Sequence, residues 1–102
     1  MSVKKQYIKN KSICKVNFRL PEEEAGSART AHVVGEFNNW NTHANPMKKL
    51  KSGAFTATVN LKSGKEYQFR YLLDETTWET DFDADRFETT PFGNSENSVI
   101  IV

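Results

Sequence analysis

The sequence predicts an all-β fold, an antiparallel β-sandwich built from six to eight short strands. Three observations support this prediction. Apolar residues recur at every second position in several segments, turn residues separate these segments at short intervals, and helical periodicity is nearly absent. Because the chain has 102 residues, it fits one domain, which is large enough to bury roughly 65% of the surface that its unfolded form exposes.

The first predicted strand has apolar residues on one face, namely Cys14, Val16, Phe18 and Leu20. Cys14 is expected to be a small buried residue, because it lies on this apolar face and a lone cysteine cannot form an internal disulfide. The charged segment PEEEAGSAR then forms a solvated loop. We assign residues 1–11 to an N-terminal extension and residues 12–102 to the domain itself.

The next strands follow the same alternation. A second strand is predicted over residues 30–37, with Val34 on one face and Ala31, Val33, Gly35 and Phe37 on the other. A turn-rich segment separates it from a third strand, GAFTATVNL, and KSGK at 62–65 closes a hairpin into a fourth strand. In the fourth strand Gln68 and Arg70 point outward, whereas the inward positions are Tyr67, Phe69, Tyr71 and Leu73.

The C-terminal part is less regular. A short strand around residues 77–80 is predicted to pair back through the turn DETT, and residues 81–97 are expected to be polar and irregular. The closing segment SVIIV is apolar on both faces, which is typical of a strand in the middle of a sheet.

Charge and composition exclude several classes of function. Hydrophobic residues make up 37% of the chain, and no apolar run approaches the length of about 18 residues that a membrane span needs. Fourteen basic residues against thirteen acidic ones leave almost no surplus of positive charge, which argues against a nucleic-acid partner. The N-terminus carries lysines but no apolar h-region, so no signal peptide is predicted and a cytoplasmic location is expected.

Catalysis is weakly supported. His32 and His43 lie outside any serine or cysteine nucleophile motif, and both are expected at the surface. Seven carboxylates occur between Asp74 and Glu88. A solvated loop explains them, although a pair at the separation that glycosidases use stays an alternative. We therefore predict that the domain is not an enzyme and needs no cofactor.

Metal binding is not expected either. Asp81, Asp83 and Asp85 form a D-x-D-x-D pattern similar to the start of a calcium loop. Arg86, however, stands where that loop requires a glycine, and Phe92 where it requires a glutamate. One cysteine and two separated histidines do not supply the four ligands of a zinc site.

The two tryptophans are the best candidates for a binding site. The phenylalanines and tyrosines mostly fall on buried faces, whereas Trp40 lies in a turn after GEFNN and Trp78 lies near the margin of a sheet. With the outward Arg70 they would form a flat surface. The C–H faces of a sugar chain can stack on indoles while its hydroxyls bond to guanidinium and amide groups. In the alternative interpretation, both indoles only cover the edge of the core.

Several motifs together resemble the family 48 carbohydrate-binding modules. They are GEFNNW followed by a Gly-Ala-Phe strand, YQFRYLLD, a tryptophan a few residues later and a closing NSVIIV, and they cover about residues 12–102. The family includes the glycogen-binding domain of the AMP-activated protein kinase beta subunit and the N-terminal early-set domains of isoamylases and branching enzymes. The resemblance implies an immunoglobulin-like (early-set) sandwich that binds α-glucans such as glycogen or starch, with a glucan-active enzyme or a kinase as a further partner.

The resemblance also implies which residues contact the sugar. The two stacking tryptophans of the family match Trp40 and Trp78, and its basic sheet residue matches Arg70, where the kinase modules have lysine. The turn before Trp78 is one residue longer than the usual D-G-x-W. The last loop supplies the other matches, which are Phe92 as an apolar wedge, Asn94 in place of a common threonine, and Asn97 as one of two paired amides, with Glu96 in place of the other.

Two other functions stay open at this stage. The first is an early-set domain that docks another protein through a sheet face and has lost sugar binding. The second is a small hydrolase, which is the weaker alternative. Family members that cut glucans use a separate barrel of about 250 residues, and this chain has no room for it.

Overall fold

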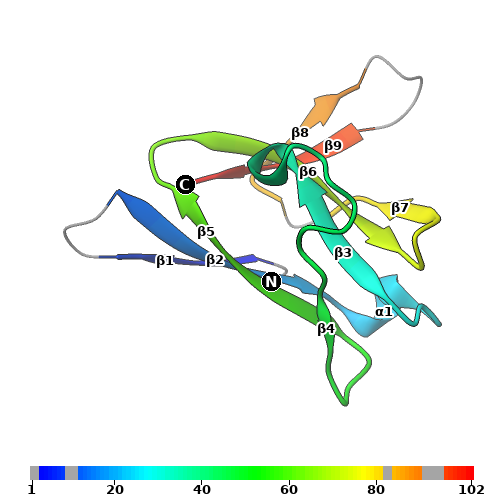
Figure 1. The fold of residues 1–102 in the computed structure, drawn as a ribbon. Helices are drawn as coiled ribbons and strands as arrows, with labels where there is room; N and C mark the ends of the chain where they lie inside the picture. The colour runs from blue at the N-terminus through cyan, green and yellow to red at the C-terminus, as the bar shows by residue number, and fades with distance from the viewer. Residues whose placement is uncertain (1–2, 9–11, 82–83, 91–95) are drawn as a thin grey trace.

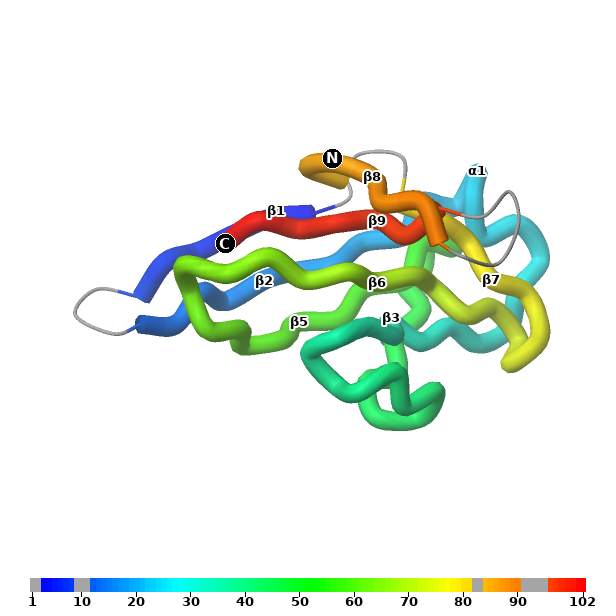
Figure 2. Tube along the Cα trace, turned by 90° about the horizontal axis from the view of Figure 1, so that it is seen from above, coloured from blue at the N-terminus to red at the C-terminus, as the bar shows by residue number. Residues whose placement is uncertain are grey.

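The computed structural model describes residues 3–8, 12–81, 84–90 and 96–102. Within these residues the chain forms nine strands, which pair antiparallel in two sheets that face each other (Figures 1 and 2). The predicted all-β sandwich is therefore confirmed. The strand number exceeds the predicted range by one. The six segments that the sequence analysis placed all form strands, and β1, β4 and β8 are additional.

Sheet A contains four strands in the order β1-β2-β5-β4, and they are β1 (Val3–Tyr7), β2 (Ile13–Leu20), β5 (Phe55–Lys62) and β4 (Lys48–Lys49). β2 and β5 pair along their whole length, from Ile13 opposite Lys62 to Leu20 opposite Phe55. β1 lies within the segment that the sequence analysis assigned to an N-terminal extension. It pairs with β2 and forms one edge of the sheet.

Sheet B has the order β3-β6-β9-β8, and its strands are β3 (Ala31–Gly35), β6 (Glu66–Leu73), β9 (Glu96–Ile101) and β8 (Arg86–Thr89). A short strand, β7 (Thr77–Glu79), pairs with the second half of β6. β9 lies between β6 and β8. Its position confirms that the apolar C-terminal strand is internal to a sheet.

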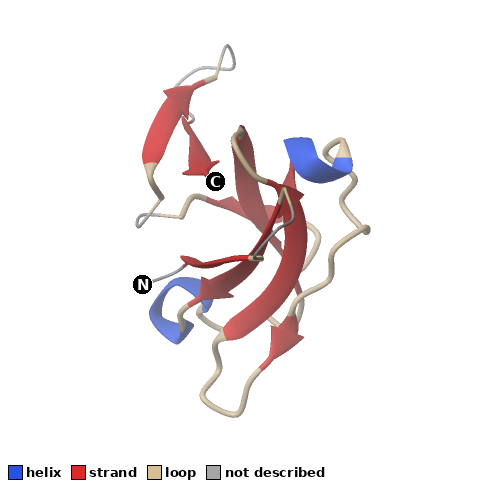
Figure 3. Ribbon diagram, turned by 90° about the vertical axis from the view of Figure 1, so that its left-hand side faces the viewer, coloured by secondary structure: helices blue, strands red, loops and turns tan. Residues whose placement is uncertain are grey.

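Four local expectations were wrong. The segment 62–65 was expected to close a hairpin, but β5 and β6 belong to different sheets, so it connects sheet A to sheet B. The segment 81–97 was expected to be irregular, but it contains β8 and the start of β9; the residues of β8 are all exposed, so pairing with β9 forms this strand rather than burial. The strand predicted over 30–37 ends at Gly35, and Phe37 lies in a 3-10 turn, η1 (Glu36–Asn38). The charged loop contains one helical turn, α1 (Glu22–Ala25), visible with η1 in Figure 3.

The core fills the space between the two sheets. Phe18 of sheet A contacts Phe69 of sheet B with ring centroids 5.0 Å apart, and Phe37 stacks on Phe18 at 5.6 Å. Cys14 is a buried free thiol, as predicted. The predicted inward residues of β6 are confirmed, since Phe69, Tyr71 and Leu73 are buried and Tyr67 packs against the core.

A polar cluster lies inside this apolar core. The Tyr71 hydroxyl donates to Asp81 Oδ2 at 2.7 Å, and the Asp81 backbone N–H donates to Ser98 Oγ at 2.7 Å. The Ser98 hydroxyl in turn donates to the Asp81 carbonyl at 3.3 Å. Burial, and then the negative charge of Asp81, raise the pKa of Tyr71 well above its ordinary value. The phenol therefore stays protonated and ties β6 to β9 through Asp81.

Candidate functional site

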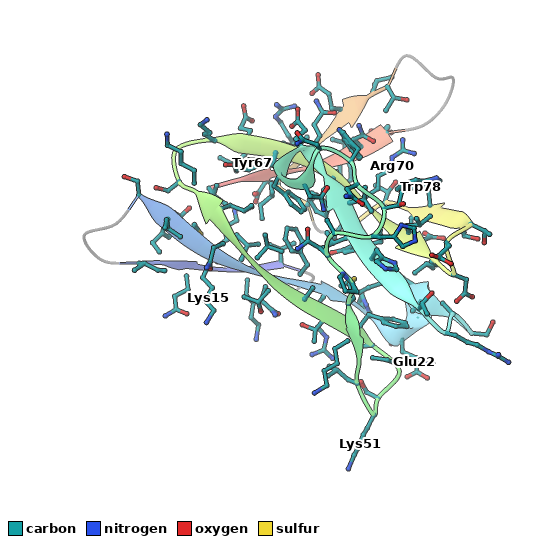
Figure 4. The ribbon with its side chains drawn as sticks, viewed as in Figure 1. Lys15, Glu22, Lys51, Tyr67, Arg70 and Trp78 are labelled. Carbon is teal, nitrogen blue, oxygen red and sulfur yellow. The ribbon has the colours of Figure 1, made fainter. Side chains whose placement is uncertain are left out.

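Arg70 and Trp78 lie on the outer face of sheet B. Trp78 is the register partner of Leu72, and Arg70 precedes Leu72 by two residues, so both side chains point to the same face. Diagonal neighbours of this kind are about 7–8 Å apart. Figure 4 shows Arg70 and Trp78 on the same side of the molecule. The Trp78 side chain is 44% exposed.

Two amides hold Arg70 in place. The Arg70 Nε donates to Asn97 Oδ1 at 2.6 Å, and Asn97 Nδ2 donates to Gln68 Oε1 at 2.9 Å. This chain of bonds fixes the plane of the guanidinium, which is the geometry that oriented recognition requires. The structure thus brings the predicted Arg70, Trp78 and Asn97 to one face. It adds Gln68, whose outward position two residues before Arg70 was the available signal.

The motif GEFNNW builds the loop that carries Trp40. A Cβ atom on Gly35 would lie 2.5 Å from the Gln68 carbonyl oxygen and 2.8 Å from Phe69 Cβ, so only glycine fits where β3 approaches β6. The Glu36 carboxylate then accepts the Gln68 backbone N–H at 2.6 Å. Phe37 is half-buried and packs against the core. These contacts anchor the start of the loop to sheet B.

Asn38 closes the same loop. Its Oδ1 accepts the Gly35 N–H at 3.1 Å, and its Nδ2 donates to the Val33 carbonyl at 3.1 Å and to Asn45 Oδ1 at 2.7 Å. The Val33 N–H also donates to the Asn45 carbonyl at 3.1 Å. The residues on both sides of Trp40 are therefore held against β3.

Trp40 has a strained backbone. It and Asn39 adopt left-handed conformations with φ of 58° and 56°, which cost about 1–2 kcal/mol for a bulky residue such as tryptophan. The Trp40 N–H donates to the Gly35 carbonyl at 2.9 Å, while its side chain is 38% exposed. Strain that serves to present an apolar ring to solvent is typical of a binding site.

The Trp40 loop contacts the hairpin that carries Trp78. His43 Nε2 lies 2.5 Å from Glu75 Oε1, and the His43 ring packs edge to face on His32 with centroids 5.5 Å apart. Glu75 belongs to the turn between β6 and β7. We call the His43–Glu75 contact the clasp. The sequence analysis correctly expected His43 at the surface but missed the clasp, because no local pattern signals a contact between residues 32 positions apart.

Asp74, which precedes Glu75 in the same turn, also secures this hairpin. Its Oδ1 accepts the backbone N–H groups of Arg29 at 2.8 Å and Thr30 at 3.0 Å. The bonds from Thr30 and then Arg29 lower the pKa of the Asp74 carboxyl below its ordinary value. The predicted DETT turn thus also fastens the entry of β3 to the end of β6.

The remaining predicted site residues are placed as follows. Phe92 and Asn94 lie outside the described residues. Of the D-x-D-x-D pattern, Asp83 also lies outside them, Asp81 points into the core, and Asp85 accepts a bond from Lys5 Nζ at 2.7 Å. In the described ranges no group of three His, Cys, Asp or Glu residues is arranged to hold a metal ion.

The chain was compared with models of protein families. The model for carbohydrate-binding module 48 (isoamylase N-terminal domain) matches residues 10–92. A comparison with curated proteins finds no match. In the part of the chain that the structure describes, no helix is both long and apolar enough to span a membrane.

Proposed function

The chain belongs to the carbohydrate-binding module 48 family, and we propose that it binds α-glucans through the outer face of sheet B without catalysing a reaction. The observation that supports this most is the meeting of an exposed indole, a held guanidinium and two amides on one flat face. Trp78, Arg70, Asn97 and Gln68 supply these groups. In this proposal Trp40 provides a second stacking ring, and Phe92 and Asn94 extend the site from the last loop.

The exposure of the tryptophans favours this function over the alternative that both indoles only cover the edge of the core. Indoles with that role would be stabilised by burial. Trp40 and Trp78 are 38% and 44% exposed, whereas the ring of Phe69 in the same sheet is fully buried. The strain at Trp40 points the same way, because it stabilises nothing in the free protein.

The proposed site is weak. If each indole removes about 100 Å² from water at roughly 25 cal/mol per Å², stacking contributes about 5 kcal/mol. Three or four hydrogen bonds add about 1 kcal/mol each, and association costs at least about 4 kcal/mol. The dissociation constant is then about 0.1 to 1 mM. Such a site is useful when tethered or repeated, so we propose that it recruits a glucan-active enzyme or a kinase to a cytoplasmic glucan.

The contacts of the carboxylates support a non-catalytic role. Glycoside hydrolysis needs two carboxyl groups that face a common substrate. Asp74 binds backbone N–H groups, Asp81 is buried against Tyr71, and Asp85 pairs with Lys5. Each of these groups already serves the fold.

The test is a titration of isotope-labelled protein with maltoheptaose, followed by the side-chain and backbone NMR signals of each residue. We expect shifts at Trp40, Arg70 and Trp78 at millimolar ligand and none at Tyr7, an exposed aromatic residue of sheet A. Cellohexaose, whose glucose units are β-linked, serves as the control ligand. An absence of shifts at the three residues with saturating maltoheptaose contradicts the proposal.

A further inference from the structure

The outer face of sheet A carries basic side chains and no acidic ones. Register places five cations on it, which we call the basic face, and they are Lys4, Lys15, Arg19, Lys48 and Lys62. All five are exposed. The four strands of this sheet contain no acidic residue. Since the whole chain has nearly equal numbers of acidic and basic residues, the carboxylates must gather elsewhere.

The cations of the basic face are evenly spread. Each row of residues across the strands holds at least one of them. Arg19 and Lys48 flank Thr56, Lys4 lies beside Asn17, and Lys15 lies between Gln6 and Asn60. Asn17 donates to the hydroxyls of Thr56 at 3.0 Å and Thr58 at 3.1 Å. These bonds order the neutral side chains that lie between the positive charges.

These charges have no carboxylate partner in the part of the chain that the structure describes. Among the described residues, none of the five cations lies within salt-bridge distance of a carboxylate. Some cations elsewhere do have such partners: Lys5 pairs with Asp85 at 2.7 Å, and Arg86 contacts Glu66 at 2.9 Å and also Glu88. Lys51 and Lys65 are also exposed and make no ion pair with a described carboxylate, but they lie in separate turns. The five cations of the basic face share one surface, where they are available to an anionic partner.

We propose that the basic face binds an extended, carboxylate-rich segment of a partner protein. Successive rows are two residues apart along a strand, which is about 6.8 Å. An extended peptide with an acidic residue at every second position presents carboxylates at the same spacing. β2 and β5 have eight residues each, so a peptide of about eight residues spans the face over about 27 Å.

The side chains of the face favour a polypeptide over other polyanions. Single-stranded nucleic acid is usually held by aromatic rings between the cations, and the outward positions of sheet A contain none. Binding in the plane of a membrane surface needs apolar side chains that enter the lipid, and on this face only Ile13 is apolar, half-buried at one end.

The experiment measures binding of a fluorescein-labelled peptide of alternating Glu and Ser, about eight residues long, by fluorescence anisotropy. We compare the double variant Lys15→Gln/Lys62→Gln with the matched control Lys51→Gln/Lys65→Gln, which removes the same charge from turns outside the face. We expect the first variant to bind the peptide about fivefold more weakly than wild type and the control to change by less than about twofold. Binding should also weaken as salt shortens the Debye length from about 30 Å to about 8 Å.

Three outcomes would overturn the proposal. One is equal weakening by both variants, which would mean that only net charge matters. Another is absence of peptide binding at low salt. The third is tighter binding, through Lys15 and Lys62, of an oligothymidylate of equal charge or of phosphatidylserine vesicles, which would assign the face to a different class of partner. Thermal melting followed by circular dichroism verifies that both variants fold. The glucan titration is independent, so each proposal can fail alone.

Discussion

The two sheets have the same construction but opposite outer faces. Both alternate apolar inward residues with outward ones, and both contribute a phenylalanine to the contact between Phe18 and Phe69. On sheet A the outward positions are mostly lysines, threonines and asparagines. On sheet B they include Trp78, an arginine held by Asn97, and a polar network. The comparison teaches that the alternation defines the fold and leaves every second position free for a separate role.

The faces differ in how they are made rigid. On sheet A, strand pairing and the bonds of Asn17 suffice. On sheet B, a loop that contains the left-handed Trp40 is fastened by Asn38 and by the clasp. Rings that must lie flat against a ligand need exact positions, whereas spaced charges tolerate movement.

The largest expected effect comes from breaking what the two sheets share. Phe69→Ala should lower the free energy of unfolding by about 3–5 kcal/mol, because it leaves a cavity beside Phe18 at the contact between sheets. Urea unfolding followed by tryptophan fluorescence and by circular dichroism measures it. Phe87→Ala, at a 39% exposed ring, is the control and should cost less than about 1 kcal/mol. Two separate transitions would contradict a shared core.

The second largest effect tests whether glucan binds the outer face of sheet B and not sheet A. Trp78→Ala should weaken maltoheptaose binding by about 2 kcal/mol, or roughly thirtyfold, through the loss of a stacking surface. Calorimetry measures the change. Tyr7→Ala removes a 59% exposed ring from sheet A and should leave glucan affinity unaltered. If Trp78→Ala binds as wild type does, the outer face of sheet B is not the glucan site.

A charge substitution sharpens the comparison further. Arg70→Gln should weaken glucan binding by about 1 kcal/mol, because it removes the guanidinium that Asn97 orients. Arg19→Gln, at an outward position of sheet A, should leave glucan binding unchanged and should weaken binding of the acidic peptide. NMR titration with each ligand distinguishes the two variants. A reversed pattern would exchange the roles of the faces.

The clasp is expected to matter less. Glu75→Gln keeps the size of the side chain but removes its charge beside His43, and exposed pairs contribute less than about 1 kcal/mol. Glucan affinity should fall by less than about threefold. Glu66→Gln, which breaks the contact with Arg86 elsewhere on sheet B, is the control. A tenfold loss in Glu75→Gln alone would show that the clasp sets the distance between the indoles.

The smallest effect is confined to acid. The pKa of Asp74 in the folded protein is lowered from 3.8. Its contribution to stability is therefore present above that value and is lost as the pH falls through the lower, folded-state pKa. Amide exchange of Arg29 and Thr30 should accelerate there in wild type. Asp74→Asn should not show this acid-dependent acceleration, and the same acceleration in that variant would contradict the assignment.

The sequence predicted the strands in which apolar and polar residues alternate. It missed the strands that form only because they pair with a neighbouring strand. The strands through Phe18, Phe55 and Phe69 were found because burial imposes a period of two. Almost no side chains are buried in β1, β4 and β8. Their sequences therefore show no alternation, and the strands can be recognised only from their pairing with adjacent strands. Val34 was placed correctly outside the sheet-to-sheet core but is nevertheless buried.

The candidate site divides in the same way. Arg70 and Trp78 follow from outward phase and from the resemblance. The bond from Arg70 to Asn97 and the clasp join residues 27 and 32 positions apart. Such contacts depend on the arrangement of strands in space, and no local pattern contains them.

The serine buried at position 98 has a consequence for folding. β9 is apolar on both sides, so sliding it by one residue against its neighbours would expose little extra hydrocarbon. Such a slip would, however, remove the Ser98 hydroxyl that accepts the Asp81 N–H. The loss of this hydrogen bond in the apolar interior would destabilise the shifted register. The Ser98 side chain thereby fixes the register of β9, for which the burial of apolar side chains alone would allow several registers.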